Sequence, residues 1–285
     1  MQQKDRLHSD ESARVAHGAM VEQLVKSIRG TDVTEVPFPH LIVDDILPVP
    51  VFDALVDDLP KPDSMPSAAE KGWASVAKYE GHRTSLFSEL QVDNTGLWQA
   101  VEQALLDHEV EQAIIDRFLP WIPPSALERS LRREVRLDCT TAGAFFNPHT
   151  DHPASFMKQL IYLTPAEYDS SLDTLLYSPR DSARRLRELG PSQDFQADEY
   201  RHESPEAHRE AGRVKHRPNR MFVFLRSVRS LHGFGPLQCS APRYVIAVHR
   251  QFASPDDEAE AVKEPASELL KRGDESAPAG RIPRE

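Results

Sequence analysis

The first half of the chain carries apolar residues mainly at helical spacing. This spacing occurs over residues 11–29, 51–59 and 97–119, and each run ends beside a glycine or a proline, the residues that most often terminate helices. Residues 36–47 form a short β-like segment that leads into the second of these helices. Residues 62–81 are rich in Ser, Pro and Lys and predict a loop. The first half is therefore predicted to consist of helices around one strand.

The second half has a different pattern, with short runs of β-branched, aromatic and other apolar residues. Four such runs occur, at 135–139, 159–163, 221–225 and 244–248. Turn-rich stretches separate them. Short strands spaced in this way predict a sandwich or a barrel.

A highly charged segment interrupts the β-rich half at residues 178–217. It contains nine Lys or Arg, eight Asp or Glu and three His, with few large apolar side chains. This composition predicts a solvated insertion and not a core element, and we hypothesise that the insertion acts as a lid. Its histidines, His202, His208 and His216, are predicted to be solvated as well.

Length and composition favour one main domain with elaborations. A single core rarely grows beyond about 250–300 residues, and this chain has 285. We place an N-terminal helical extension at 1–33 and the main domain at 34–254, where 34–130 form helical support and 131–254 the β-rich core. Residues 255–285 are rich in acidic residues and proline, and predict a disordered tail.

The charge balance and the termini restrict the function classes. The formal net charge is −11, from 34 basic and 45 acidic residues, and both nucleic-acid and anionic-membrane binding need a basic surface. A small molecule or a peptide is the expected partner. Two cysteines, Cys139 and Cys239, predict packing in a reducing compartment and not a disulfide framework. Residues 1–10 are polar and lack the apolar stretch of a secretory signal, which predicts a cytoplasmic location.

A candidate metal site follows from His149 and Asp151. On extended backbone, side chains two residues apart share a face, so both can reach one ion, although His-x-Asp alone is also common as a surface pair. A third candidate ligand, His232, follows the predicted strand 221–225. Two imidazoles and one carboxylate on one face of an octahedron leave three positions open, as in non-haem iron(II) oxygenases. The pattern predicts a mononuclear iron(II) site.

Arg243 makes this pattern more specific. It lies eleven residues after His232 (243 − 232 = 11) and opens the predicted strand 244–248. The planar guanidinium binds carboxylates bidentately, so a buried Arg243 suits a dicarboxylate co-substrate. Taken alone, it would be read as a surface arginine before a strand. Lys158 is the alternative cation for this role.

These residues, together with Tyr162, resemble the motifs of the 2-oxoglutarate and iron(II)-dependent oxygenases of the prolyl-hydroxylase-like kind, over residues 38–252. The resemblance implies an α+β fold, a double-stranded β-helix (a jelly-roll or cupin-like barrel) with N-terminal helices packed on it. It implies that His149, Asp151 and His232 are the catalytic iron ligands. It also implies that Arg243 and Tyr162 bind the distal carboxylate of 2-oxoglutarate.

The activity implied by the resemblance is that of a dioxygenase. Such an enzyme would use O2 and 2-oxoglutarate to hydroxylate or otherwise oxidise a small-molecule or peptidyl substrate, with release of succinate and CO2. The carboxylate at Asp151 favours hydroxylation or another oxidation, because halogenases of the family have a small residue there. Two departures concern the co-substrate region: Val245 stands where many relatives have a small residue, and residues 173–176 replace a Gly-Gly-Leu element.

Two other classes of function stay open. Asn147-x-His149-x-Asp151-His152 is similar to the zinc motif of metallo-β-lactamase-like hydrolases, with Asn147 in place of the first histidine. A β-barrel can also serve as a non-catalytic binding module, because fold does not imply function. The primary substrate is not predicted. The polar stretch 81–85, with His82 and Arg83, is read as a loop that could contact it.

Overall fold

A computed structural model describes residues 17–68, 70–71, 81–165, 169–181 and 205–253 of this chain. The helices are residues 17–29, α2 (Val49–Asp57), α3 (Thr95–Leu105), α4 (His108–Phe118) and α5 (Pro124–Leu127). The strands are β1 (His40–Val43), β2 (His82–Leu86), β3 (Leu131–Thr140), β4 (Phe146–His149), β5 (Ser155–Tyr162), β6 (Thr174–Pro179), β7 (His208–Val214), β8 (Met221–Leu225), β9 (His232–Phe234) and β10 (Arg243–Phe252). Short 3₁₀ turns are η1 (Pro62–Ser64), η4 (Phe87–Glu89), η5 (Leu119–Trp121), η6 (Ser170–Leu172) and η7 (Pro205–Ala207).

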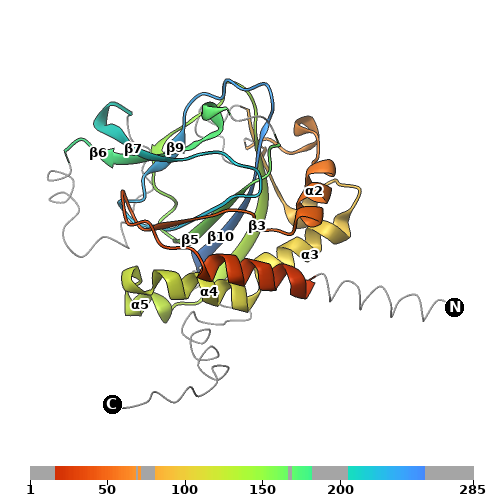
Figure 1. Ribbon diagram of the computed structural model, residues 1–285. Helices are drawn as coiled ribbons and strands as arrows, with labels where there is room; N and C mark the ends of the chain where they lie inside the picture. The colour runs from red at the N-terminus through yellow and green to blue at the C-terminus, as the bar shows by residue number, and fades with distance from the viewer. Residues whose placement is uncertain (1–16, 69, 72–80, 166–168, 182–204, 254–285) are drawn as a thin grey trace, which may run out of the picture.

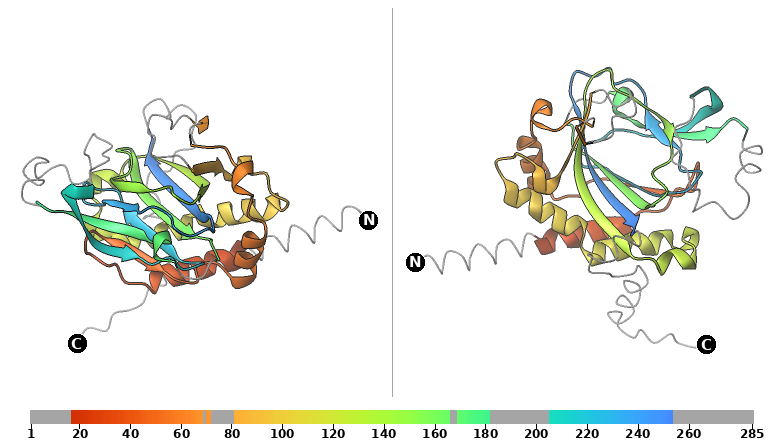
Figure 2. Two further views of the ribbon diagram at one scale, coloured as in Figure 1. Left: turned by 90° about the horizontal axis from the view of Figure 1, so that it is seen from above. Right: turned by 180° about the vertical axis from the view of Figure 1, so that it is seen from behind.

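The larger of two antiparallel sheets has six strands in the order β1-β8-β5-β10-β3-β2. Helices cover one of its faces (Figures 1 and 2). Alternate residues of the central strands, such as Leu137, Ile246 and Val248, are buried on that face. They belong to one apolar cluster with buried residues of the helices. Burial of each such side chain contributes about 1.5–3 kcal/mol, so this cluster is the main core.

The other face of the six-stranded sheet meets a four-stranded antiparallel sheet, ordered β4-β9-β6-β7. Val245 and Ala247 of β10 and Phe222 of β8 pack here with Leu176 of β6 and Val214 of β7. The two sheets thus enclose a second, smaller core between them. All residues of the candidate site described below reach this enclosed space.

Much of the predicted secondary structure is confirmed. The four predicted strands of the β-rich half lie within β3, β5, β8 and β10, and β1 leads into α2 as expected. The α+β class is confirmed, with helices packed on a β-rich core. Over the part of the chain that the structure describes, however, the strands form two sheets and do not close into one barrel.

The single helix predicted over 97–119 is wrong. The structure has two helices there, α3 and α4, because the side chain of Asp107 caps a new helix start by accepting a hydrogen bond from the backbone N–H of Glu109 (2.9 Å). The apolar period continues across the break, since both helices bury one face on the same core. A local capping residue decided the boundary.

The sequence also failed to predict β2 and β7. The polar run 81–85 was read as a loop, but residues 82–86 form an edge strand beside β3. In the predicted insertion, β7 pairs with β6 at the edge of the small sheet, and edge strands tolerate charged residues. His208, in β7, and His216, just after it, are both buried, so the prediction that they are solvated is wrong. His202, with residues 182–204, lies outside the described residues, as does the predicted tail.

Two further observations concern composition. Cys139 is buried, Cys239 is half-buried, and both are free thiols, as predicted for packing residues. None of the helices in the described ranges combines the length and the apolar character needed to cross a membrane.

A buried ion network joins the helices to the six-stranded sheet. Arg133 of β3 and Arg250 of β10 lie directly opposite each other, which would place two like charges side by side. Glu111 of α4 resolves this conflict, because its two carboxylate oxygens accept from Arg133 Nε and Arg250 Nε, each at 2.8 Å. Arg250 Nη2 also donates to the Leu105 carbonyl at the end of α3 (3.1 Å). Both helices are thereby fixed against β10.

Replacement of Glu111 by alanine is expected to lower the free energy of unfolding by about 3–5 kcal/mol, because it leaves Arg250 as an uncompensated buried charge. Denaturant unfolding followed by circular dichroism measures this change. Glu109→Ala, on the exposed face of the same helix, serves as the control and should cost less than about 1 kcal/mol. Equal losses in the two variants would contradict the proposed role of Glu111.

Candidate metal centre

Strands β4 and β9 bring the predicted metal ligands together. In their antiparallel register, His149 is the direct partner of His232, and the two imidazole ring centres are 4.4 Å apart. Asp151 follows two residues after His149. One ligand atom from each of the three side chains lies within 4.8 Å of the others, and all three residues are buried. This group could hold one metal ion.

The close approach of β4 and β9 depends on Gly233. A Cβ atom at this position would lie 2.4 Å from the Phe146 carbonyl oxygen and 2.9 Å from that of Asn147. Real Cβ atoms do not come so close to backbone, so any larger residue would push the strands apart. The glycine after His232 therefore fixes the distance between the two imidazoles.

Backbone carbonyl groups orient both imidazoles. His149 Nδ1 donates to the Asn147 carbonyl (2.9 Å), and His232 Nδ1 donates to the Ser230 carbonyl (2.9 Å). Each bond joins a histidine to the residue two positions earlier. Because Nδ1 carries the proton in both rings, the Nε2 lone pairs are left as the ligand atoms.

Asp151 is held in place by two basic residues. Lys158 Nζ donates to Asp151 Oδ1 (3.2 Å), and the fully buried Arg226 donates from Nε to the Asp151 backbone carbonyl (3.3 Å). The second carboxylate oxygen, Oδ2, is buried and has no hydrogen-bond partner. A buried, unsatisfied carboxylate oxygen is costly, and a metal ion beside His149 and His232 would satisfy it.

The protonation states fit a metal site. Burial holds the pKa of His149 well below its ordinary value and also lowers the pKa of His232. Burial acts to raise the pKa of Asp151, but the Lys158 ammonium and the two imidazoles hold it below its ordinary value. Metal ligands must be deprotonated, and all three are so at neutral pH. The His–Asp–His set suits a divalent transition metal with open coordination positions.

Arg243 and Tyr162 lie together beside this group. Arg243 Nε donates to the Leu172 carbonyl (3.0 Å), and Nη2 donates to Thr174 Oγ1 (3.0 Å). Thr174 Oγ1 also bonds the Tyr162 hydroxyl at 2.7 Å. The guanidinium carbon is 4.9 Å from the ring centre of Phe234, two residues after His232. One hydroxyl thus joins the two predicted co-substrate residues.

The charge of Arg243 is not balanced by a carboxylate. Its side chain is buried, yet it makes no ion pair with any carboxylate in the described ranges. Asp138 and Asp173 act on Arg243 electrostatically but do not pair with it. N–H donors of the guanidinium are therefore left for an anionic ligand. Lys158, the alternative cation, is engaged with Asp151. Val245, where a small residue was expected, is the cross-strand partner of Tyr162 and packs in the inner core.

The structure does not assemble a second metal position from the zinc-type motif. The side chain of His152 is exposed, and its Nδ1 accepts from the Ala154 backbone N–H (3.1 Å). Asn147 contributes its backbone carbonyl to orient His149. Among the described residues, the single group of metal-ligating side chains is the His–Asp–His set.

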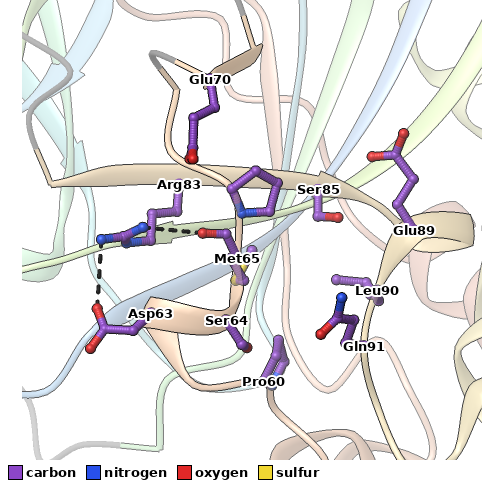
Figure 3. A pocket seen from close by; sticks show the side chains of 11 residues that line it. Pro60, Asp63, Ser64, Met65, Glu70, Arg83, Ser85, Glu89, Leu90 and Gln91 are labelled. Carbon is purple, nitrogen blue, oxygen red and sulfur yellow. Dashed lines mark hydrogen bonds and ion pairs between the residues drawn. The ribbon is translucent and has the colours of Figure 1, made fainter.

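His82 and Arg83, the predicted substrate contacts, point to opposite faces of β2. His82 lies toward the metal-bearing strand, with its ring centre 5.5 Å from that of Phe146. Arg83 lines a pocket of about 410 Å³ on the other face, where its guanidinium pairs with Asp63 (3.6 Å) and donates to the Met65 carbonyl (3.1 Å) (Figure 3). Only His82 is placed on the side of the candidate metal centre.

Sequence reasoning missed two residues of this site, Gly233 and Thr174, and the contact of Lys158 with Asp151. Gly233 gave no signal apart from its position after His232, and Thr174 was noted only as a departure from a family motif. The role of Lys158 could have been found by the period of two along residues 159–163, which places it on the same face as Tyr162. Its partner Asp151, however, lies on a different segment.

No family model matches the sequence, and no curated protein sequence matches it either. Similar solved structures include a prolyl hydroxylase from Trichoplax adhaerens, in complex with a hypoxia inducible factor peptide fragment (14% identity, TM-score 0.49, 90% of this chain and 96% of that chain). A second is a Pseudomonas putida prolyl-4-hydroxylase (14% identity, TM-score 0.44, 82% of this chain and 100% of that chain). A third is the epimerase SnoN in complex with Fe3+, alpha ketoglutarate and nogalamycin RO (14% identity, TM-score 0.44, 83% of this chain and 85% of that chain).

The family named from the sequence motifs recurs among these neighbours. Their identities and TM-scores are low, so the activity of this chain is inferred from its own residues.

Substitution of Gly233 by alanine is expected to separate β4 from β9 and to weaken binding of a divalent metal by about tenfold or more, as do other changes around metal ligands. Overpacking should also lower stability by about 1–3 kcal/mol. Calorimetric titration with Mn²⁺ measures the affinity. Gly235→Ala is the matched control, since a Cβ there meets nothing within 4 Å. Equal affinities in the two variants would contradict the close-approach constraint.

Proposed function

We propose that this protein is an iron(II)- and 2-oxoglutarate-dependent dioxygenase. The observation that carries the proposal is a buried guanidinium, that of Arg243, which makes no ion pair within the described residues and lies beside a buried His–Asp–His group. The metal-ligating group leaves coordination positions open. The arginine supplies a binding site for one carboxylate of a dicarboxylate ligand. A metal ion together with a 2-oxo dicarboxylate satisfies both requirements.

In this proposal, iron(II) is held by Nε2 of His149 and His232 and by Oδ2 of Asp151. The Asn147 and Ser230 carbonyls keep the imidazoles in the tautomer that leaves Nε2 unprotonated. Lys158 holds Oδ1 and leaves Oδ2 as the ligand atom. When bound, iron and 2-oxoglutarate supply the oxidising chemistry, in which O2 is consumed and succinate and CO2 are released.

Arg243 and Tyr162 would bind the distal carboxylate of 2-oxoglutarate. An arginine has five N–H donors, and the two bonds that Arg243 makes to Leu172 and Thr174 leave others for a ligand. Those two bonds fix the direction of the guanidinium before the ligand arrives. Burial raises the pKa of the Tyr162 hydroxyl, so it stays protonated and able to donate. The co-substrate site is thus preorganised.

The inner apolar residues would exclude water from the reacting atoms. Phe224 packs against His232, with ring centres 4.6 Å apart, and belongs to the same inner cluster as Leu160 and Phe222. In this proposal the two sheets are the two halves of a double-stranded β-helix, and residues 34–254 are the oxygenase domain. The substrate is a small molecule or a peptidyl residue, which is hydroxylated or otherwise oxidised.

Alanine in place of His149, Asp151 or His232 is expected to weaken iron(II) binding by more than about 100-fold, a larger loss than changes around metal ligands cause. Anaerobic calorimetric titration with iron(II) measures the affinity, and circular dichroism checks the fold. Asp151→Gly keeps both imidazoles, so it should retain weak iron binding but lose 2-oxoglutarate-dependent oxidation.

The control for this series is His152→Ala, which removes an exposed histidine next to Asp151. It should bind iron(II) like the unaltered protein. Unchanged iron affinity in all three ligand variants would rule out the assignment.

Arg243→Ala is expected to weaken 2-oxoglutarate binding by about 2–5 kcal/mol, the usual cost of losing one partner of a buried charge pair. Tyr162→Phe removes a single hydrogen bond and should cost about 0.5–3 kcal/mol. Titration of the iron-loaded protein with 2-oxoglutarate under argon gives both values. Iron affinity should not change in either variant, and an intact 2-oxoglutarate affinity in Arg243→Ala would exclude this arginine as its binding residue.

A further inference from the structure

Strands β2 and β3 carry several polar side chains on the inner face of the six-stranded sheet. On β3, Leu137 and Cys139 point to the helices, so Asp138 between them points to the inner face. On β2, Thr84 is the direct partner of Asp138, and His82 is two residues from Thr84 on the same face. These residues lie on the same face of the sheet as the apolar residues of β5 and β8, but on the other side of β10.

Asp138 has a vacant acceptor. Its Oδ1 accepts a hydrogen bond from Thr84 Oγ1 (2.7 Å), which fixes the carboxylate on the inner face. No ion pair joins Asp138 to a cation anywhere in the described ranges, and the residue is partly accessible to solvent. Burial acts to raise the pKa of Asp138, but the surrounding charges and the Thr84 bond hold it below its ordinary value. Asp138 is therefore a carboxylate at neutral pH.

The cations on this inner face are engaged elsewhere. Lys158 bonds Asp151, and Arg136 pairs with Glu134 on β3. Arg243 is committed to the co-substrate in the proposed function. The two nearby imidazoles do not compensate the charge, since burial lowers the pKa of His82, and lowers that of His249 to about 3. Asp138 therefore makes no direct ion pair with any described residue, although Lys158 and Arg243 act on it electrostatically.

Asp138 is linked to the metal-ligating group electrostatically, through His82 and through Lys158. His82 lies at the edge of the Phe146 ring (5.5 Å between centres), and Phe146 contacts His149 (5.0 Å). On the other side, Lys158 acts electrostatically on both Asp138 and the metal ligand Asp151. Asp138 is therefore placed beside the proposed reaction centre.

We propose that Asp138 is a specificity-determining residue that binds a cationic nitrogen of the primary substrate, an alkylammonium or a guanidinium. This inference rests on the proposed function and deepens it, because it names the class of substrate. Thr84 is a positioning residue for the carboxylate. A cationic group held by Asp138 would place a neighbouring carbon of the substrate against the metal-bearing strands β4 and β9.

The test uses the holoprotein, loaded with iron(II) and 2-oxoglutarate under argon so that no turnover occurs. Calorimetry compares two pairs of probes that differ in charge but have side chains of equal length: acetyl-arginine amide with acetyl-citrulline amide, and acetyl-lysine amide with the acetyl amide of 2-aminoheptanoic acid. At least one cationic probe should bind about tenfold or more tightly than its neutral counterpart. The preference should vanish in Asp138→Asn, which keeps an acceptor for Thr84 but removes the charge.

Asp138→Glu keeps the charge and should keep the preference for the cationic probe. Asp116→Asn, which removes an exposed carboxylate on α4, is the control for net charge and should also keep it. Circular dichroism reports whether each variant is folded. The iron and 2-oxoglutarate affinities of each variant are measured separately to confirm that it is loaded, because Asp138 acts electrostatically on Arg243.

Equal binding of cationic and neutral probes, or no binding of either cationic probe, would overturn the inference and would indicate that Lys158 compensates Asp138 in the loaded protein. A preference that persists in Asp138→Asn would overturn it as well. If the holoprotein does not form because iron(II) or 2-oxoglutarate fails to bind, the proposed function fails and the inference fails with it. If the holoprotein forms without a charge preference, the inference alone is wrong.

Discussion

Strand β10 is buried on both faces, and this double burial constrains the rest of the structure. Ile246 and Val248 pack on the helices, whereas Val245 and Ala247 pack toward the small sheet. Because successive residues of a strand point to opposite faces, a shift of one residue in register would exchange the two sets and bring Arg243 to the helix face. The register of β10 with β3 and β5 is therefore strongly specified, and with it the side on which the site lies.

The metal-ligating group lies where the two sheets converge, and its geometry depends on short strands. β4 and β9 have only four and three residues, so few hydrogen bonds hold them together. The absence of a side chain at Gly233 lets the backbones approach each other. Buried charge is expensive, and Lys158 compensates Asp151 while leaving one carboxylate oxygen without a partner. The site has a carboxylate oxygen without a partner, as expected of a site that must accept a metal ion.

The charges of the six-stranded sheet are divided between its two faces. On the helix face, one carboxylate, that of Glu111, bridges Arg133 and Arg250, so that this network is structural. On the inner face, neither Arg243 nor Asp138 makes a direct ion pair within the described residues, and the two interact only electrostatically. The ion network that stabilises the fold thus lies on one face, and the charges that favour ligands lie on the other.

The sequence by itself determined the elements with strong apolar periods, and it identified five residues of the candidate site. Spacing of two predicted that His149 and Asp151 share a face, because the period of a strand is a local property. The partnership of His149 with His232, the contact of Lys158 with Asp151 and the vacant acceptor of Asp138 were decided only by the tertiary structure. Polar edge strands such as β2 carry no apolar period, so neighbouring strands decide that they form. The period of two along a strand decides on which face a side chain lies. Only the packing of the strands into sheets, which buries their apolar faces, decides which side chains contact each other.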